Sequence, residues 1–273
     1  MFKTLHKGLL AAVFASLPLA ALAEGSVALE DVAKISVLPG WRTQDGSHMA
    51  AFRIQLAPGW KTYWRAPGDA GIPPQFGWKG SRNLKSVEFH WPTPTVHDQN
   101  GMRSIGYEGD VIIPVELTPN SADGPDIRLR GQMELGVCHD VCIPVSAKFD
   151  AELGRSEVKT PAIVASLKDH PLPAKQAGVE TVTCSIEPIS DGLRLTAVIA
   201  LPKLGPNEIA VVEFADQTTW VSPAETERQG RNLIVVSDLV PTSGKPFLLQ
   251  RSDLRFTVLG RDRAVDIHGC QAG

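Results

Sequence analysis

The sequence predicts an all-β protein made of two β-sandwich domains. Short runs rich in Val, Ile, Phe and Thr recur along the chain, and Gly, Pro, Asn and Asp separate them, which is the pattern of strands punctuated by turns. The 273 residues exceed the roughly 100 residues of one ordinary sandwich, so two domains are expected. The clearest strand-like runs are Ala50–Leu56, Val111–Leu117, Leu193–Leu201, Leu233–Val236 and Leu254–Leu259.

The amino-terminal segment has the three parts of an export signal. Lys3 and Lys7 precede an apolar run, and Ala21-Leu22-Ala23 then offers small residues at alternate positions for a signal peptidase. We therefore expect a signal peptide over residues 1–23 and a mature chain that begins at Glu24 in the periplasm, after passage through the inner membrane. The apolar run is too short to cross a bilayer, so a soluble mature protein is expected. The alternative is an uncleaved signal that stays as a membrane anchor.

Charge and motifs exclude several classes of function. The formal net charge of −3 gives no electrostatic reason to bind nucleic acid. The sequence has no glycine-rich phosphate loop, no metalloprotease helix motif and no nucleophile-elbow serine motif, so no cofactor is expected.

A connector divides the chain at residues 157–178. Helical periodicity is scarce, and its best candidate is Ala162–Lys168, with Thr160 placed to cap the helix and a proline in the first turn. Two further prolines follow that cannot continue a helix or serve a central strand. We therefore expect one sandwich domain over residues 24–156 and a second over residues 179–273.

All four cysteines lie in the exported part of the chain. An oxidising compartment allows disulfides, and four cysteines allow three pairings. Keeping each bond within one domain selects Cys138 with Cys142 and Cys184 with Cys270. In the chain-entropy model the long loop of the second pair stabilises by about 4 to 5 kcal/mol, and the short loop of the first by only about 2 kcal/mol. The two bonds are therefore expected to have different roles.

The short pair has the spacing of a thiol-exchange site. A disulfide that is labile can be opened by a thiolate, and resolution of the mixed disulfide requires two thiols within one turn of each other. His139, if protonated, would favour a thiolate, whereas Asp140 would oppose it, so the net effect on the pKa stays open. The order in which Cys138 and Cys142 attack also stays open.

Two other interpretations use the same residues. Turn disulfides of purely structural purpose share this spacing, which would make the protein a non-catalytic adaptor with inert disulfides. Cys138, His139 and Cys142 are also plausible soft ligands for copper(I), so a copper carrier is the second alternative. Copper-delivery proteins of the Sco type place such a motif in a thioredoxin-like fold, whereas the segments Ile127–Glu134 and Val145–Asp150 around this pair look like strands.

Four sequence segments carry a family resemblance. In order, they resemble the amino-terminal periplasmic domain of the thiol:disulfide interchange protein DsbD and its ScsB-like relatives. The resemblance covers residues 30–155, and the second domain looks like the extra sandwich region of the ScsB-like branch. The segments are Tyr63–Pro74, Trp91–Pro94, Gly106–Val111 and Val137–Pro144.

The resemblance implies a fold and an activity. It implies two immunoglobulin-like β-sandwich domains joined by the short helical, proline-rich connector, and a thiol:disulfide oxidoreductase of the protein-disulfide reductase type. Cys138 and Cys142 map onto the family's redox cysteines. Electrons would come from a membrane conduit and pass to periplasmic thioredoxin-fold proteins, such as disulfide isomerases, cytochrome c biogenesis thioredoxins or stress reductases.

The resemblance also implies a shielding loop and has two departures. In that family an aromatic-bearing loop covers the cysteine pair, so Tyr63 and Trp64 are candidates to flank the sulfurs; the alternative is that both are core or hairpin residues. The better-known DsbD domain separates its cysteines more widely. This chain also ends at Gly273 without transmembrane segments, so we expect a separate membrane donor of the DsbD or CcdA type.

Overall fold

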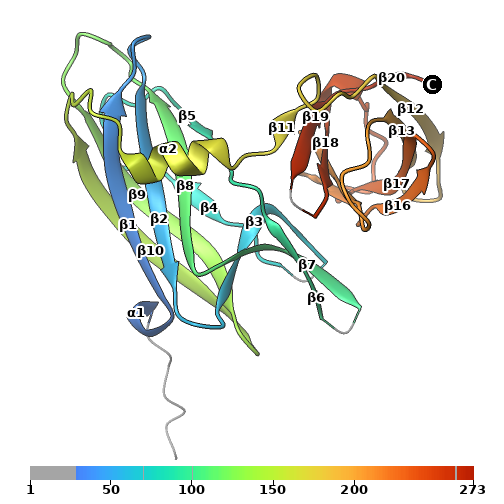
Figure 1. Cartoon of the computed structure of the whole chain (residues 1–273), viewed down its shortest axis with the longest axis horizontal. Coiled ribbons are helices and arrows are strands. Elements are labelled where there is room, and N and C mark those ends of the chain that lie inside the picture. The colour runs from blue at the N-terminus through green and yellow to red at the C-terminus, as the bar shows by residue number, and fades with distance from the viewer. Residues whose placement is uncertain (1–28, 70, 100, 262) are drawn as a thin grey trace, which may run out of the picture.

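The chain folds into two β-rich bodies that lie side by side and are joined by a helix-bearing connector (Figure 1). The computed structural model describes residues 29–69, 71–99, 101–261 and 263–273. The expected signal peptide, residues 1–23, lies outside the described residues. Both bodies are sandwiches of two sheets, so the all-β, two-sandwich prediction is confirmed.

The first sheet of the first domain is antiparallel and four-stranded. It follows a short helix, α1 (Leu29–Val32). In order across the sheet, its strands are β1 (Ala33–Arg42), β2 (His48–Leu56), β8 (Asp110–Thr118) and β5 (Ser86–Phe89).

The second sheet of this domain carries the short cysteine pair at one edge. All its pairings are antiparallel, and β4 (Gln75–Gly77) joins it by pairing with β9. Phe52 of the first sheet packs edge-on against Phe149 of the second, with ring centroids 5.0 Å apart, so apolar side chains of both sheets form one core. In order, the strands are β10 (Cys142–Leu153), β9 (Ile127–Cys138), β3 (Lys61–Gly68), β7 (Met102–Glu108) and β6 (Thr95–Gln99).

The connector helix covers the outer face of the first sheet. Helix α2 (Pro161–Lys168) begins at the proline, with Thr160 at the N-cap position but without a side-chain capping bond. Its buried Ile163 packs against Trp41 and Met49 of β1 and β2. The chain then enters β11 (Leu172–Pro173), which pairs in parallel with a strand of the second domain.

The second domain also consists of two sheets. Cys184 on β12 is fully buried and is bonded to Cys270, which lies just before the last strand. The 3-10 helix η1 (Arg251–Asp253) precedes β18. One sheet has the order β11, β19 (Ala264–His268), β18 (Leu254–Leu259) and β14 (Ile209–Phe214), and the other β15 (Thr219–Val221), β17 (Asn232–Pro241), β13 (Leu193–Ala200), β12 (Thr181–Pro188) and β20 (Gln271–Ala272), with β16 (Glu225–Gln229) paired to β17.

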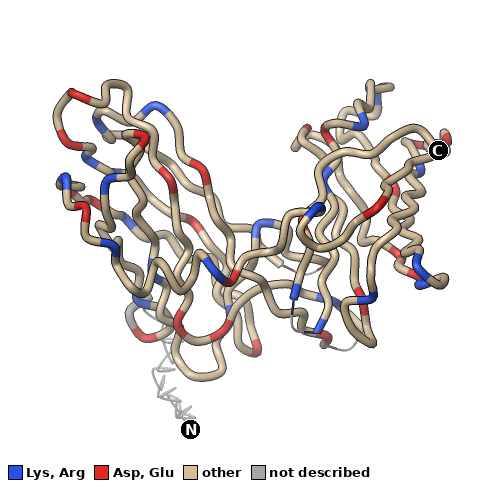
Figure 2. Tube along the Cα trace, turned by 45° about the horizontal axis from the view of Figure 1, so that its top comes forward, with Lys and Arg blue, Asp and Glu red and all other residues tan. Residues whose placement is uncertain are grey.

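The two domains are packed together and not only tethered. Leu259 and Ala264 of the second domain are buried in the same apolar cluster as the core of the first. The backbone N–H of Thr93 also donates to the carbonyl of Asp169 in the connector, at 2.8 Å. Acidic and basic residues are interspersed over both domains (Figure 2). Among the described residues, the helices are all too short or too polar to span a bilayer.

Candidate redox disulfide

Cys138 and Cys142 are bonded to each other at the end of a long hairpin. Cys138 is the last residue of β9, Cys142 is the first of β10, and the two are direct cross-strand partners with Cα atoms 4.1 Å apart. Three residues form the turn between them, and Val141 in this turn is 71% exposed. Because β10 is the edge strand of its sheet, the disulfide lies at a corner of the domain.

The two cysteines differ strongly in exposure. Cys138 is 1% exposed, whereas Cys142 is exposed to solvent. Burial alternates along β9 as far as Glu134, but every residue from Leu135 to Cys138 is buried. Both faces of the strand are therefore covered next to the disulfide, and an approaching group meets Cys142 first.

A loop excursion provides this cover. Strand β9 pairs with β3 through Cys138 and Val137, and then with β4 from Glu134 onward. Ile72, between β3 and β4, lies against β9 near this change of partner, because a Cβ atom on Gly136 would be 2.8 Å from its Cβ. This residue belongs to the segment Tyr63–Pro74, in which the family resemblance implied a shielding loop.

Tyr63 is the side chain that lies on the sulfurs. Its hydroxyl donates to Sγ of Cys138 at 2.8 Å and lies 3.2 Å from Sγ of Cys142. The residue is 4% exposed, and burial raises the pKa of the Tyr63 phenol above its ordinary value. The phenol therefore keeps its proton at neutral pH and remains a hydrogen-bond donor.

Two glycines make room for the Tyr63 ring. A Cβ atom on Gly71 would lie 2.8 Å from the ring, and one on Gly136 would lie 3.1 Å from it and 2.8 Å from Cβ of Ile72. The ring is therefore held between the covering loop and β9. Gly71 lies within the expected segment Tyr63–Pro74, whereas Gly136 was not expected from the sequence, although a glycine inside a strand is a known sign of close approach by another group.

Trp64 lies elsewhere. It is fully buried and belongs to the core cluster of the first domain, with the guanidinium of Arg65 3.9 Å above its ring. Successive side chains of a strand point to opposite faces, so Tyr63 and Trp64 cannot both face the sulfurs. Of the two places expected for this tryptophan, the structure gives it the core one.

His139 and Asp140 pair with each other in the turn. Nδ1 of His139 lies 3.0 Å from Oδ2 of Asp140, and the imidazole packs against Trp60, with ring centroids 5.8 Å apart. The Asp140 side chain is 92% exposed and that of His139 is 46% exposed, so water screens this pair.

Lys61 is a further residue that sequence analysis missed. It lies in register with Cys138 on one side and with Glu108 on the other, and it is largely buried. Registered partners share a face of the sheet, so this lysine is on the same face as Tyr63 and the disulfide. Only the pairing of β3 with β9, across more than 70 residues, reveals it.

The second expected disulfide is separate from this corner, whereas the expected copper ligands are the same residues. Cys184 and Cys270 are bonded inside the second domain, with Cα atoms 5.9 Å apart. Among the described residues, no three His, Cys, Asp or Glu side chains gather in a metal-binding arrangement, and both cysteines of the proposed copper site are in disulfide form.

Fold and site together define an immunoglobulin-like domain whose hairpin-end disulfide lies under a tyrosine of strand β3. Residues 27–153 match the family model of the N-terminal domain of the thiol:disulfide interchange protein DsbD. This part of the chain is therefore a DsbD N-terminal-like domain, related to thiol:disulfide interchange.

A solved structure shows the same fold over both domains. The crystal structure of the N-terminal periplasmic domain of ScsB from Proteus mirabilis matches with a TM-score of 0.66 and 22% identity, over 89% of this chain and 95% of that chain. No curated protein is similar enough to count as a match. The match to ScsB includes the second domain, which the family model does not cover.

Proposed function

We propose that this protein is a periplasmic thiol:disulfide oxidoreductase that relays electrons through Cys138 and Cys142. The observation that carries the proposal is the position of the two sulfurs, which lie under the Tyr63 hydroxyl at the end of an edge hairpin with Cys142 exposed. The donor would be a membrane protein of the DsbD or CcdA type, and the acceptors would be periplasmic thioredoxin-fold proteins.

The difference in exposure supports an order of events. In the reduced protein, the Cys142 thiolate attacks a sulfur of the client's disulfide, and the client's other sulfur leaves as a thiolate. The Cys138 thiolate then attacks Sγ of Cys142 in the mixed disulfide and releases the client's second sulfur. The client's disulfide is thus reduced by two electrons to two thiols, and the Cys138–Cys142 disulfide is formed again. A dithiol of the membrane donor reverses these steps and is itself oxidised.

Tyr63 supports the step in which the Cys138–Cys142 disulfide is reduced. When a donor thiolate attacks Cys142, the S–S bond breaks and its electron pair moves to Sγ of Cys138. The Tyr63 hydroxyl, 2.8 Å from that sulfur, is placed to donate to the developing thiolate. A hydrogen bond to a charged acceptor is stronger than one to a neutral acceptor, so Tyr63 favours the thiolate over the bonded sulfur.

The second disulfide supports a division of roles. Cys184 is fully buried, and the bond to Cys270 joins positions 86 residues apart. A buried bond that closes a long loop stabilises the fold and is difficult for another protein to reach. We assign Cys184–Cys270 to structure and Cys138–Cys142 to exchange.

Covalent trapping tests the proposal. Cys138→Ser removes the resolving thiol and leaves the exposed Cys142, so this variant is expected to accumulate a mixed disulfide with a thioredoxin-fold protein in a periplasmic extract. Cys142→Ser, which keeps only the buried thiol, is the matched control and is expected to trap far less. If neither variant captures a thioredoxin-fold protein, the relay is wrong.

A further inference from the structure

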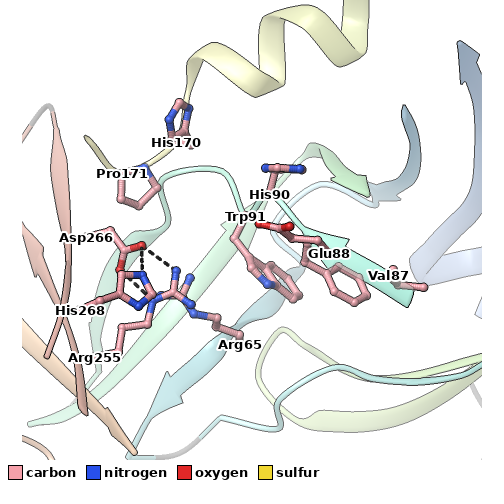
Figure 3. Close-up of a pocket in the computed structure, with 11 residues that line it drawn as sticks. Arg65, Val87, Glu88, His90, Trp91, His170, Pro171, Arg255, Asp266 and His268 are labelled. Carbon is pink, nitrogen blue, oxygen red and sulfur yellow. Dashed lines mark hydrogen bonds and ion pairs between the residues drawn. The ribbon is translucent and has the colours of Figure 1, made fainter. Parts of the chain in front are cut away.

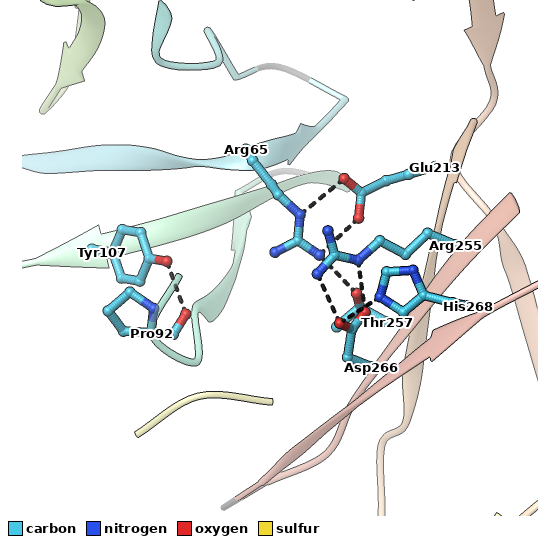
Figure 4. A network of polar contacts seen from close by, with 8 residues as sticks. All are labelled: Arg65, Pro92, Tyr107, Glu213, Arg255, Thr257, Asp266 and His268. Atoms are coloured by element: carbon cyan, nitrogen blue, oxygen red, sulfur yellow. Dashed lines mark hydrogen bonds and ion pairs between the residues drawn. The ribbon is translucent and has the colours of Figure 1, made fainter. Parts of the chain in front are cut away.

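Arg65 joins the two domains directly beside the redox site. Its Nε and Nη2 atoms donate to the two carboxylate oxygens of Glu213 at 3.0 and 2.9 Å. Nη2 also donates to Oγ1 of Thr257 at 3.1 Å. Both partners belong to the second domain, whereas Arg65 lies on β3, two residues after Tyr63 (Figure 4). The Arg65 side chain is only 14% exposed, so the ion pair is largely shielded from water.

A second arginine completes the network. Arg255 is the cross-strand partner of Glu213 and forms a two-point ion pair with Asp266, with both N–O distances 2.7 Å. Arg65 and Arg255 thus lie together with two carboxylates to balance them. Burial lowers the pKa of the Arg65 guanidinium, but from so high an ordinary value that the group stays charged. The positive charge of the Arg65 guanidinium is therefore balanced by the Glu213 carboxylate.

The network forms one wall of a cleft between the domains. The cleft has a volume of about 450 Å³, and Arg65 and Trp91 of the first domain line it together with Arg255, Asp266 and His268 of the second (Figure 3). Beyond the polar wall, Leu259 and Ala264 continue the contact as part of the apolar core. The second domain is thus fixed to the strand that carries Tyr63.

Strand β3 needs an anchor at this point. It pairs with β9 through Lys61 and Thr62, and its register with β7 shifts between Tyr63 and Gly68. Regular ladder bonds therefore hold Tyr63 only on its amino-terminal side. On the carboxyl-terminal side, Trp64 is buried in the core of the first domain, and the ion pair of Arg65 is the next contact and the first with the second domain.

We propose that Arg65 is a positioning residue for the redox site. Its ion pair with Glu213 fixes β3 to the second domain and thereby keeps the Tyr63 hydroxyl on the two sulfurs. The second domain, whose role the sequence left open, then sets the reactivity of the disulfide in the first. This inference deepens the proposed function, because it gives a role to the second domain in thiol exchange.

A double-mutant cycle tests the inference in the full chain. The rate of Cys138–Cys142 reduction by dithiothreitol is measured by quenching, alkylation and peptide mass spectrometry, which separate this disulfide from the other. Glu213→Gln keeps the shape of the side chain and removes its charge, and it is expected to slow reduction at least about fivefold, within the range of coupling between groups in one network. In the Tyr63→Phe background, the same substitution is expected to change the rate by less than about twofold.

A matched pair in the same domain is the control. Arg194 and Asp238 form a two-point ion pair like that of Arg65 and Glu213. They lie on β13 and β17, in the other sheet of the second domain from the one that carries the partners of Arg65. Asp238→Asn is expected to leave the reduction rate within about twofold of the parent. An equal effect of Glu213→Gln in both backgrounds, an equal effect of Asp238→Asn, or no effect of Glu213→Gln would each overturn the positioning role.

A milder variant covers the case in which Glu213→Gln does not fold. Thr257→Val removes one acceptor of Arg65 and keeps the ion pair. If Thr257→Val slows reduction in the parent but not in the Tyr63→Phe variant, the inference is supported. If it leaves the rate of the parent unchanged, or slows both proteins equally, the inference is overturned. Reduction by dithiothreitol needs no protein partner. The positioning role of Arg65 can therefore fail this test while client trapping still supports the relay, and the relay can fail the trapping test while the positioning role holds.

Discussion

The hydroxyl of Tyr63 lies 2.8 Å from Sγ of Cys138 and so connects the middle of β3 to the last residue of β9. The sulfur in this contact is the less exposed of the two. Its hydrogen-bond donor, the Tyr63 hydroxyl, stays protonated because burial raises the pKa of the phenol. The different roles proposed for the two cysteines follow from their different exposure.

Removal of the hydroxyl is expected to raise the pKa of the Cys138 thiol. In Tyr63→Phe the ring still fills its place, but the thiolate loses a hydrogen bond of about 1.5 kcal/mol, which corresponds to about one pKa unit. Ultraviolet absorbance of the thiolate in the reduced protein measures the shift. Tyr107→Phe is the control, because the hydroxyl of Tyr107 donates to the carbonyl of Pro92 and not to sulfur. An equal shift in both variants would contradict a specific role of Tyr63.

A methyl group on Gly136 is expected to destabilise the protein. The added Cβ would lie 2.8 Å from Cβ of Ile72 and 3.1 Å from the Tyr63 ring, so Gly136→Ala should lower the free energy of unfolding by about 1 to 3 kcal/mol. Gly77→Ala on neighbouring β4 has its nearest contacts at 3.8 Å and should be neutral or slightly stabilising. Denaturant unfolding compares the two. A neutral Gly136→Ala would show that the ring is not tightly packed there.

Loss of the second disulfide is expected to affect stability and spare exchange. In the chain-entropy model, a loop between positions 86 apart contributes about 4 to 5 kcal/mol, so a variant with Cys184→Ala and Cys270→Ala should melt at a lower temperature. Its rate of thiol exchange through the other pair should stay near that of the parent. Lost exchange with an unchanged melting temperature would reverse the assignment of the two bonds.

Acid is expected to weaken the second domain through Asp266. Burial alone would raise the pKa of the Asp266 carboxyl, but hydrogen bonds and the charge of Arg255 outweigh burial and hold this pKa below its ordinary value. A carboxyl with a lowered folded-state pKa stabilises above its unfolded pKa of about 4, and this contribution is lost as pH falls through the lower folded-state value.

Thermal unfolding from pH 6 to pH 2 measures this effect. Asp266→Asn should be less stable than the parent at pH 6, and the difference should shrink as the medium is acidified. Asp238→Asn should follow the same course with a smaller difference, because water screens its more exposed carboxylate. A difference for Asp266→Asn that does not depend on pH would contradict the ionic role.

Much of the fold was predictable because it depends on local patterns. The alternation of apolar residues and the spacing of Gly and Pro predicted sandwiches, and the connector helix begins at Pro161, one residue before the expected start. The two strands on either side of the cysteines were also predictable, since both segments carry strand-forming residues. The domain boundaries expected from the sequence stay predictions.

The site was only partly predictable, because its register is a long-range property. Tyr63 and Trp64 are adjacent, and only the pairing of Lys61 with Cys138 decides which of them faces the sulfurs. The contact between Arg65 and Glu213 spans 148 positions, and no local pattern announces it. The glycine at position 136 was the one local signal that pointed to the packed ring.

The redox potential of the Cys138–Cys142 pair, measured by equilibration with glutathione buffers, tests the central claim most directly. An exposed disulfide that exchanges with other proteins is expected to have a potential above about −300 mV, in the range of the exchange proteins. A potential below about −300 mV would mark the bond as structural and would contradict the electron relay.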